Sequence, residues 1–321
     1  MKKLRVLYAF ILCSMLLCGC SFQTSEPISR TAIYFDTVIS IKIYDSQDET
    51  LLDQCFAFCE EFENTISRTI ETSEISQINN SKGTPVTVSD TTIELLEQGI
   101  YYGELTNGAF DITIAPLSEL WDFKNNPGVV PEDADIQDAL SHVSYKNIII
   151  DGNTVTLTDP EMAIDLGGIA KGYMADRLKE YLLIEGVESA LIDLGGNILA
   201  VGSKPNGNDF TIGIKKPFEE SKMIATESIS DLSVVTSGCY ERYFEVDGEL
   251  YHHILNTETG YPCDNGLLGV TILSEKSVDG DALSTSCFAL GLEEGKKLIE
   301  TLNGIEAIFI TDDYKIIDTR M

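Results

Sequence analysis

The sequence predicts an α+β fold in which helices and strands occur in separate runs. Apolar residues recur at helical spacing over 49–66 and 90–105, whereas 188–275 is mostly short strand patterns joined by turns. A parallel sheet would need strands and helices to alternate, and this order does not alternate. The length allows one large domain or two fused lobes, with mainly antiparallel sheet packed against helices.

The first half of the chain carries one strand pattern before its helices. Residues 31–45 alternate apolar and polar side chains, which predicts a strand. A polar segment separates the two helices, and Asp90 is a candidate N-cap of the second. Residues 122–133 resemble a loop, and two β-rich runs within 145–164 are broken at Asp151-Gly-Asn153, which indicates a hairpin.

The second half begins with a helix over 169–185 and continues with the short strands. A further helix is predicted over 277–302, interrupted near Gly291. Strands over 305–310 and 315–317 end the chain.

The N-terminus predicts a bacterial lipoprotein. A basic start precedes an apolar stretch that is too short to cross a bilayer. Leu17-Cys-Gly-Cys20 resembles a lipobox, although an ordinary signal peptide with incidental cysteines is the alternative. We expect residues 1–19 to be a signal peptide and 20–30 a tether with the lipid on Cys20. Residues 31–321 would then form the domain, anchored to the cell membrane on its extracytoplasmic face.

The chain is strongly acidic, with 52 Asp and Glu against 22 Lys and Arg and a formal net charge of −30. Nucleic acid is therefore not an expected partner, because binding it needs a basic surface. A phosphate-bearing ligand would need metal ions or backbone amides to balance its charge. Alternatively, the charge only keeps a surface-displayed domain soluble.

The cysteines beyond Cys20 match no zinc signature in their spacing. Cys55 and Cys59 are four residues apart in a predicted helix and share a face. We favour buried thiols over a disulfide here, because a chain of this size does not depend on disulfides.

A glycine-rich motif, Asp165-Leu-Gly-Gly-Ile-Ala-Lys-Gly172, leads into a predicted helix. Its glycines let the backbone approach a ligand, and the helix start offers free N–H groups to an anion. Lys171 is placed to reach a phosphate oxygen. The spacing fits neither the dinucleotide fingerprint nor the Walker loop, and a tight turn capped by Asp165 is the plain alternative.

Asp281 and Thr285 are four residues apart in a predicted helix and project from one face. A carboxylate and a hydroxyl are hard oxygen donors of the kind that Mg²⁺ prefers. The alternative is an aspartate favoured by the helix dipole, with an incidental threonine.

The chain has three histidines, of which His142 is expected at the surface. His252 and His253 adjoin a strand end, where neighbours point to opposite faces, so only one can face a shared site. That histidine could act as a general base or position a nucleophile, or it could simply bond to backbone groups.

Aromatic residues flank polar ones at Tyr34–Thr37, at Gly108–Asp111 and at Trp121. Rings next to a carboxylate or an amide suit a flat heterocycle with polar edges, although core packing is the favoured interpretation for each ring taken singly.

Taken in order, these motifs resemble the ApbE family of FAD:protein FMN transferases over residues 31–317. The resemblance also includes Ser73–Asn79, Asp193–Asn197, Thr236–Gly238 and His253–Pro262. It implies an ApbE-like fold and Mg²⁺-dependent transfer of FMN from FAD to a threonine hydroxyl of a target protein, with release of AMP. The implied acceptor is a redox-pump subunit or an extracytoplasmic flavoprotein.

Two other functions remain open beside this one. An FAD pyrophosphatase would use water in place of threonine and give FMN and AMP. A non-catalytic flavin-binding lipoprotein would not need a lysine, a histidine and a metal pair together.

The resemblance also assigns residues to roles in the site. It implies His253 and Lys171 as catalytic residues. It implies Gly168, through its carbonyl, and Asp281 and Thr285 as metal ligands. The flavin-contacting positions that it implies are Phe35, Thr69, Ala109, Phe110, Asp111, Asp165, Lys171 and Leu255.

Overall fold

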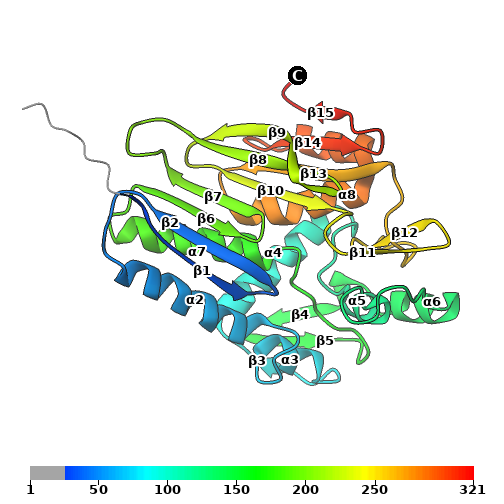
Figure 1. Cartoon of the computed structure of the whole chain (residues 1–321). Helices are drawn as coiled ribbons and strands as arrows, with labels where there is room; N and C mark the ends of the chain where they lie inside the picture. Colours follow the sequence, from blue (N-terminus) through cyan, green and yellow to red (C-terminus); the bar gives the residue numbers. More distant parts are fainter. Residues whose placement is uncertain (1–25) are drawn as a thin grey trace, which may run out of the picture.

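The computed structural model describes residues 26–321 and confirms the α+β prediction. An eight-stranded antiparallel sheet packs on one face against α2 (Thr50–Ile66), α7 (Ala170–Ile184) and α8 (Ser277–Glu300) (Figure 1). Its strands, from edge to edge, are β1 (Ile28–Tyr34), β2 (Thr37–Ile43), β6 (Ser189–Leu194), β7 (Asn197–Gly202), β10 (Ser233–Gly238), β13 (Leu267–Ser274), β14 (Glu306–Thr311) and β15 (Ile316–Asp318).

The other face of the sheet is covered by a long hairpin, β8 (Phe210–Lys216) and β9 (Glu219–Ile229). Side chains of β8 pack there on Val234 and Ile310 in a separate hydrophobic cluster. The sheet is therefore buried on both faces over its central strands, which explains their continuous apolar runs.

The remaining elements form smaller units on the helical side. A three-stranded sheet and a two-stranded hairpin accompany four α-helices and one 3₁₀ helix. They are β3 (Val86–Thr87), β4 (Ile148–Asp151), β5 (Thr154–Leu157), β11 (Tyr243–Val246), β12 (Glu249–His252), α3 (Glu74–Asn79), α4 (Asp90–Leu105), α5 (Ala115–Trp121), α6 (Asp133–Ser141) and η1 (Tyr145–Asn147).

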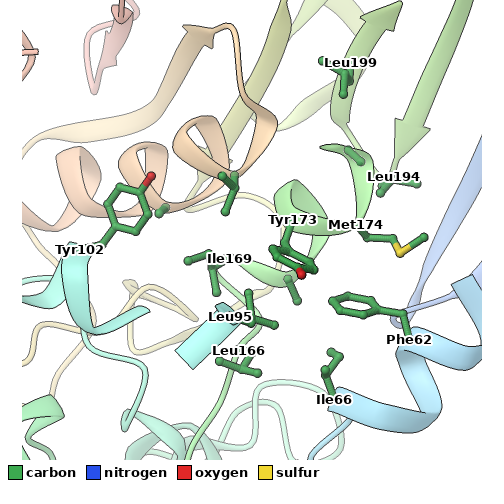
Figure 2. Close-up of a cluster of buried hydrophobic side chains, with 14 of the residues drawn as sticks. Phe62, Ile66, Leu95, Tyr102, Leu166, Ile169, Tyr173, Met174, Leu194 and Leu199 are labelled. Atoms are coloured by element: carbon green, nitrogen blue, oxygen red, sulfur yellow. The ribbon is translucent and has the colours of Figure 1, made fainter. Parts of the chain in front are cut away.

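The main core lies between the sheet and the helices, directly under the predicted glycine motif. Figure 2 shows Phe62 of α2 facing Tyr173 of α7, whose rings stack at 5.6 Å between centroids. Leu166 of the glycine motif and Leu194 at the end of β6 are buried in the same cluster. Apolar packing of Leu166 thus anchors the motif on the core, while Gly167 of the same motif is exposed.

The helix predictions over 49–66, 90–105, 169–185 and 277–302 are confirmed within two residues. Gly291 interrupts α8 with φ of 79° and ψ of 176°, as predicted. The hairpin at Asp151–Asn153 is confirmed as the β4–β5 connection.

Two local predictions are wrong. Residues 31–45 form a hairpin rather than one strand, because Phe35 and Asp36 both adopt positive φ and reverse the chain. The N-cap of α4 is Ser89, whose hydroxyl accepts from the Thr92 N–H, and not Asp90. Helix α6 was not predicted.

Strand β1 begins at Ile28, inside the predicted tether, so the folded part starts before residue 31. The predicted signal peptide and Cys20 lie outside the described residues. Among residues 26–321, no helix combines the length and hydrophobicity that a membrane crossing requires.

The five cysteines of the described part are buried and free, which confirms the preference for thiols over a disulfide. Burial raises the pKa of both Cys55 and Cys59 to about 12, so these thiols stay protonated and unreactive.

Candidate active site

The glycine motif forms a tight turn that ends where α7 begins, at Ala170. The Asp165 carboxylate accepts the Gly167 N–H at 2.8 Å and so closes the turn, but the N-cap of α7 is Ile169, which has no side-chain cap. The same carboxylate lies 3.0 Å from Nε of Arg68, which extends from the loop after α2. Asp165 therefore both closes the turn and fixes a cation beside it.

Helix α8 brings its acid and its hydroxyl to this turn. Asp281 Oδ2 accepts the Gly172 N–H at 2.9 Å. Thr285 Oγ1 lies 3.7 Å from the point that a Cβ on Gly168 would occupy. Gly172 permits the contact between the helices, because a Cβ there would lie 2.4 Å from the Ser277 carbonyl oxygen. Two motifs more than 100 residues apart in sequence thus meet at one point.

Lys171 occupies the space between the turn and α8. Its ammonium donates to the Gly167 carbonyl at 3.1 Å and lies 3.4 Å from Asp281 Oδ1. A cation is therefore already seated against a backbone carbonyl and a buried carboxylate. This local chemistry fits Mg²⁺, which prefers hard oxygens and commonly uses few protein carboxylates plus substrate phosphates.

Within residues 26–321, no group of three or more His, Cys, Asp or Glu side chains is arranged to hold a metal. A metal here would rely on a carbonyl and a hydroxyl beside the single Asp281 carboxylate. The predicted ligand set of Gly168, Asp281 and Thr285 is of this type.

The two adjacent histidines have different environments, as strand geometry predicts. His252 is buried, and its Nε2 lies 2.9 Å from the Cys263 carbonyl while its Nδ1 accepts the Ile254 N–H at 3.3 Å. Both ring nitrogens are therefore used inside the fold, and His252 is structural.

His253 is only half-buried, and its Nδ1 faces the Arg242 carbonyl at 3.4 Å. A carbonyl accepts only, so this contact places the proton on Nδ1 and leaves Nε2 as the free base. Desolvation, followed by Arg242, the neighbouring His252 and then Lys171, lowers the pKa of His253 below its usual range. The ring is therefore neutral near pH 7.

A group of cations surrounds this region in an otherwise acidic protein. Lys124 pairs with Asp36 at 2.6 Å, and this contact, together with Arg242 and Arg68, lowers the pKa of Asp36. Arg242 and Lys171 both act on His253, which connects the two sets of charges. Arg68, Lys124 and Arg242 are not among the predicted site residues, because each lies in a segment without a recognisable motif.

The segment Gly108–Asp111 lies against the glycine turn. Phe110 is buried, and its ring edge would be 3.1 Å from a Cβ on Gly168, so the glycine favours this close packing. Ala109 beside it is half-buried. The Asp111 carboxylate accepts from the Thr113 N–H and the Tyr145 N–H, each at 2.8 Å, and burial raises its pKa.

The loop that carries His253 is tied to this segment. Thr257 Oγ1 donates to the Gly108 carbonyl at 2.7 Å. Trp121 Nε1 donates to the Gly260 carbonyl at 2.9 Å. Leu255 points its side chain into a buried cluster with Trp121 and Phe244. At this predicted flavin position, the backbone of Leu255 is therefore better placed to contact a ligand than its side chain is.

The remaining predicted flavin positions lie on the loops after β1 and α2. Phe35 is half-buried in the hairpin turn, and its N–H donates to Glu63 at 2.7 Å. Thr69 is exposed, with its hydroxyl 3.1 Å from that of Ser67. The structure thus brings Gly168, Lys171, Asp281 and Thr285 together, and the flavin contacts stay predictions.

Comparison with known proteins identifies the family. A family model described as "ApbE family" matches residues 35–309. An "FAD:protein FMN transferase" of Klebsiella pneumoniae is 40% identical over 293 residues, covering 90% of each chain. One from Treponema pallidum is 32% identical over 327 residues, covering 95% of this chain and 90% of the relative.

Solved structures resemble the whole fold. The ApbE protein of Thermotoga maritima superimposes with a TM-score of 0.84 at 32% identity, covering 91% of this chain and 97% of that one. The flavin transferase ApbE of Vibrio cholerae gives a TM-score of 0.81 at 29% identity, covering 91% and 96%.

Proposed function

The chain belongs to the ApbE family, and we propose that it transfers FMN from FAD to a threonine hydroxyl of an acceptor protein in a Mg²⁺-dependent reaction that releases AMP. The main support for this proposal is that Asp281 and Thr285 of α8 lie against the glycine turn. That meeting combines backbone groups, a lysine and hard oxygens at one point, which suits a diphosphate.

The charges around the site favour an anionic substrate. FAD carries two negative charges on its diphosphate, and the protein has a net charge of −30. At the site, Arg68, Lys124 and Lys171 each pair with a carboxylate and Arg242 adds a further positive charge, so the site is less acidic than the protein as a whole. Fixed positive groups of this kind stabilise the charge that develops on a transferring phosphoryl group.

Mg²⁺ would be held by the Gly168 carbonyl, the Asp281 carboxylate and the Thr285 hydroxyl. When bound, such an ion withdraws charge from phosphate oxygens and stabilises phosphoryl transfer. Lys171 adds a fixed positive charge next to Asp281.

In the proposed reaction, the acceptor threonine oxygen attacks the phosphorus of the FMN half. The bond from that phosphorus to the bridging oxygen breaks, and AMP leaves with the bridging oxygen. The threonine proton passes to Nε2 of His253, which is free and neutral because Nδ1 faces the Arg242 carbonyl. The product carries a phosphoester bond to the protein.

The test is incubation of the protein with FAD, Mg²⁺ and a threonine-bearing acceptor, with and without a chelator. We expect a covalent fluorescent band on the acceptor that the chelator abolishes. Free FMN and AMP without a labelled acceptor would instead identify an FAD pyrophosphatase. Retained FAD with no release of AMP would identify a binding protein.

We also propose that Cys20 anchors the protein to the cell membrane on the extracytoplasmic face, where it would meet a redox-pump subunit or an extracytoplasmic flavoprotein. The lipobox-like sequence before Cys20 supports this. Cys20→Ala should move the protein from the membrane fraction to the soluble fraction, and unchanged membrane association would refute the anchor.

A further inference from the structure

A chain of hydroxyl groups connects β10 with the proposed metal ligand on α8. Ser237 Oγ of β10 lies 3.0 Å from Thr285 Oγ1. It also lies 2.8 Å from Ser284 Oγ, which in turn donates to the Asp281 carbonyl at 3.0 Å. The chain therefore starts at one proposed ligand, Thr285, and ends on the backbone of another, Asp281.

The direction of the protons along this chain is fixed by its last member. A carbonyl oxygen only accepts, so the single proton of Ser284 goes to Asp281. Ser284 is fully buried, so no solvent offers its proton another partner. Ser237 must then donate to Ser284, and with its own proton used it accepts from Thr285. The Thr285 proton is thus directed at Ser237.

We propose that Ser237 is a positioning residue of the metal site, which accepts a hydrogen bond from the Thr285 hydroxyl so that Thr285 presents only lone pairs to a divalent cation. This inference rests on the proposed function, since that function supplies the role of Thr285 as a ligand. Groups behind the direct ligands commonly fix ligand orientation in this way, and their loss weakens metal binding.

A matched contact lies at the other end of the same strand–helix interface. Ser233 Oγ donates to Ser277 Oγ at 3.0 Å, and Ser277 Oγ donates to Asn197 Oδ1 at 2.6 Å. Between the two contacts, Val235 packs against Gly280, and its Cγ2 would be 2.7 Å from a Cβ on that glycine. The two serines of β10 therefore share one face of the strand, about 13 Å apart by strand rise.

The hydrogen bonds that start at Ser237 end on a proposed metal ligand, whereas those that start at Ser233 end on the amide of Asn197. Ser233→Ala and Ser237→Ala remove the same hydroxyl group from the same interface. Only the Ser237 change should reach the cation, so Ser233→Ala is the control for packing and hydrogen-bond loss.

The experiment is a Mn²⁺ titration of the full-length protein, followed by electron paramagnetic resonance of the free ion, with and without FMN. We expect Ser237→Ala to weaken Mn²⁺ binding about tenfold or more, and Ser237→Thr, which keeps the hydroxyl, to restore most of it. Ser233→Ala should stay within about twofold of the unsubstituted protein, since its chain does not touch a ligand. Thermal unfolding of the metal-free variants separates folding from binding.

Equal Mn²⁺ affinity for Ser237→Ala and the unsubstituted protein would overturn the inference and leave the proposed function intact. An equal loss in Ser233→Ala would also overturn it, because the effect would then be general to the interface. Failure of the unsubstituted protein to bind Mn²⁺ would overturn the metal site of the proposed function, and this inference with it.

Discussion

The tetrapeptide Asp-Leu-Gly-Gly occurs at 165–168 and again at 193–196, and the two copies fold differently. In the first, neither glycine has positive φ and the chain enters α7. In the second, Gly195 and Gly196 have φ of 69° and 91° and form the two-residue turn between β6 and β7. In both, the leucine is buried and the aspartate accepts a glycine N–H at 2.8 Å.

What differs is the surroundings of each turn. The first copy faces α8 with its acid and hydroxyl, and its Asp165 also holds Arg68. The second copy packs on the start of β2, where a Cβ on Gly195 would lie 2.1 Å from Thr37 Oγ1. The same four residues thus form a candidate ligand-binding turn and a structural turn, and tertiary contacts decide which.

The largest expected effect comes from removing the acid that faces the first turn. Asp281→Ala should abolish transfer, a loss of about 10³-fold or more, because the cation loses its only carboxylate ligand.

His253→Ala should slow transfer by about 10²-fold or more through loss of the base. The measurement is the rate of flavin fluorescence appearing on the acceptor.

Asp281→Asn is the control for folding, since it keeps an oxygen that can accept the Gly172 N–H. We expect it to fold and to be as inactive as Asp281→Ala. Near-normal flavinylation by Asp281→Asn and His253→Ala would contradict the assignment of both residues.

The glycines provide the next comparison. Gly195→Ala should destabilise the fold by roughly 3 kcal/mol, since it combines left-handed backbone with a collision at Thr37. Gly168→Ala should cost only about 1 kcal/mol, because φ there is ordinary and the nearest atom is the Phe110 ring edge at 3.1 Å. Its main effect should be on transfer, by about tenfold or more, through displacement of the carbonyl.

Chemical denaturation and the transfer assay together check this pair. A Gly195→Ala protein that is as stable as the parent, or a Gly168→Ala protein with full activity, would show that the two turns do not differ in the way described.

Replacing the aspartate of each copy should give a smaller difference between the two turns. Asp193→Ala should lower the free energy of unfolding by about 1 kcal/mol, from one hydrogen bond in an exposed turn, with transfer unchanged. Asp165→Ala should cost a similar amount of stability but also reduce FAD binding, because Arg68 loses the carboxylate that holds it beside the turn and keeps only its ion pair with Glu119. Equal FAD affinity in both variants, measured by flavin fluorescence titration, would refute a ligand role for the first turn.

The smallest expected effect is that of pH. His253 works as a base only when neutral, so activity should fall as the pH drops through its folded pKa. Burial and neighbouring positive charges lower that pKa to about 3, so transfer should change less than about twofold between pH 8 and pH 6. A tenfold fall in the initial rate over that range would contradict a lowered pKa at His253.

Much of the site could be predicted because its parts are local. The four-residue spacing of Asp281 and Thr285 places both side chains on one face of any helix, and the glycine motif predicts a turn before α7. The strand position of His252 and His253 correctly implied that they face different surroundings. These features follow from backbone periodicity, which sequence reveals directly.

The missed features depend on contacts between distant segments. Arg68, Lys124 and Arg242 lie in different loops, and only the fold directs their charges at one region. The β1–β2 turn was missed because Phe35 and Asp36 adopt positive φ without the glycine or asparagine that usually marks such a turn. Ser237 was part of a noted motif, but its role depends on hydroxyls of α8 that only tertiary packing brings near.

The most direct test of the central claim is the position of a bound cation. In crystals grown with FAD and Mn²⁺, we expect an anomalous peak touching the Gly168 carbonyl, the Asp281 carboxylate, the Thr285 hydroxyl and the substrate diphosphate at roughly 2.0–2.2 Å. A peak on the diphosphate that contacts none of these protein oxygens would contradict the account.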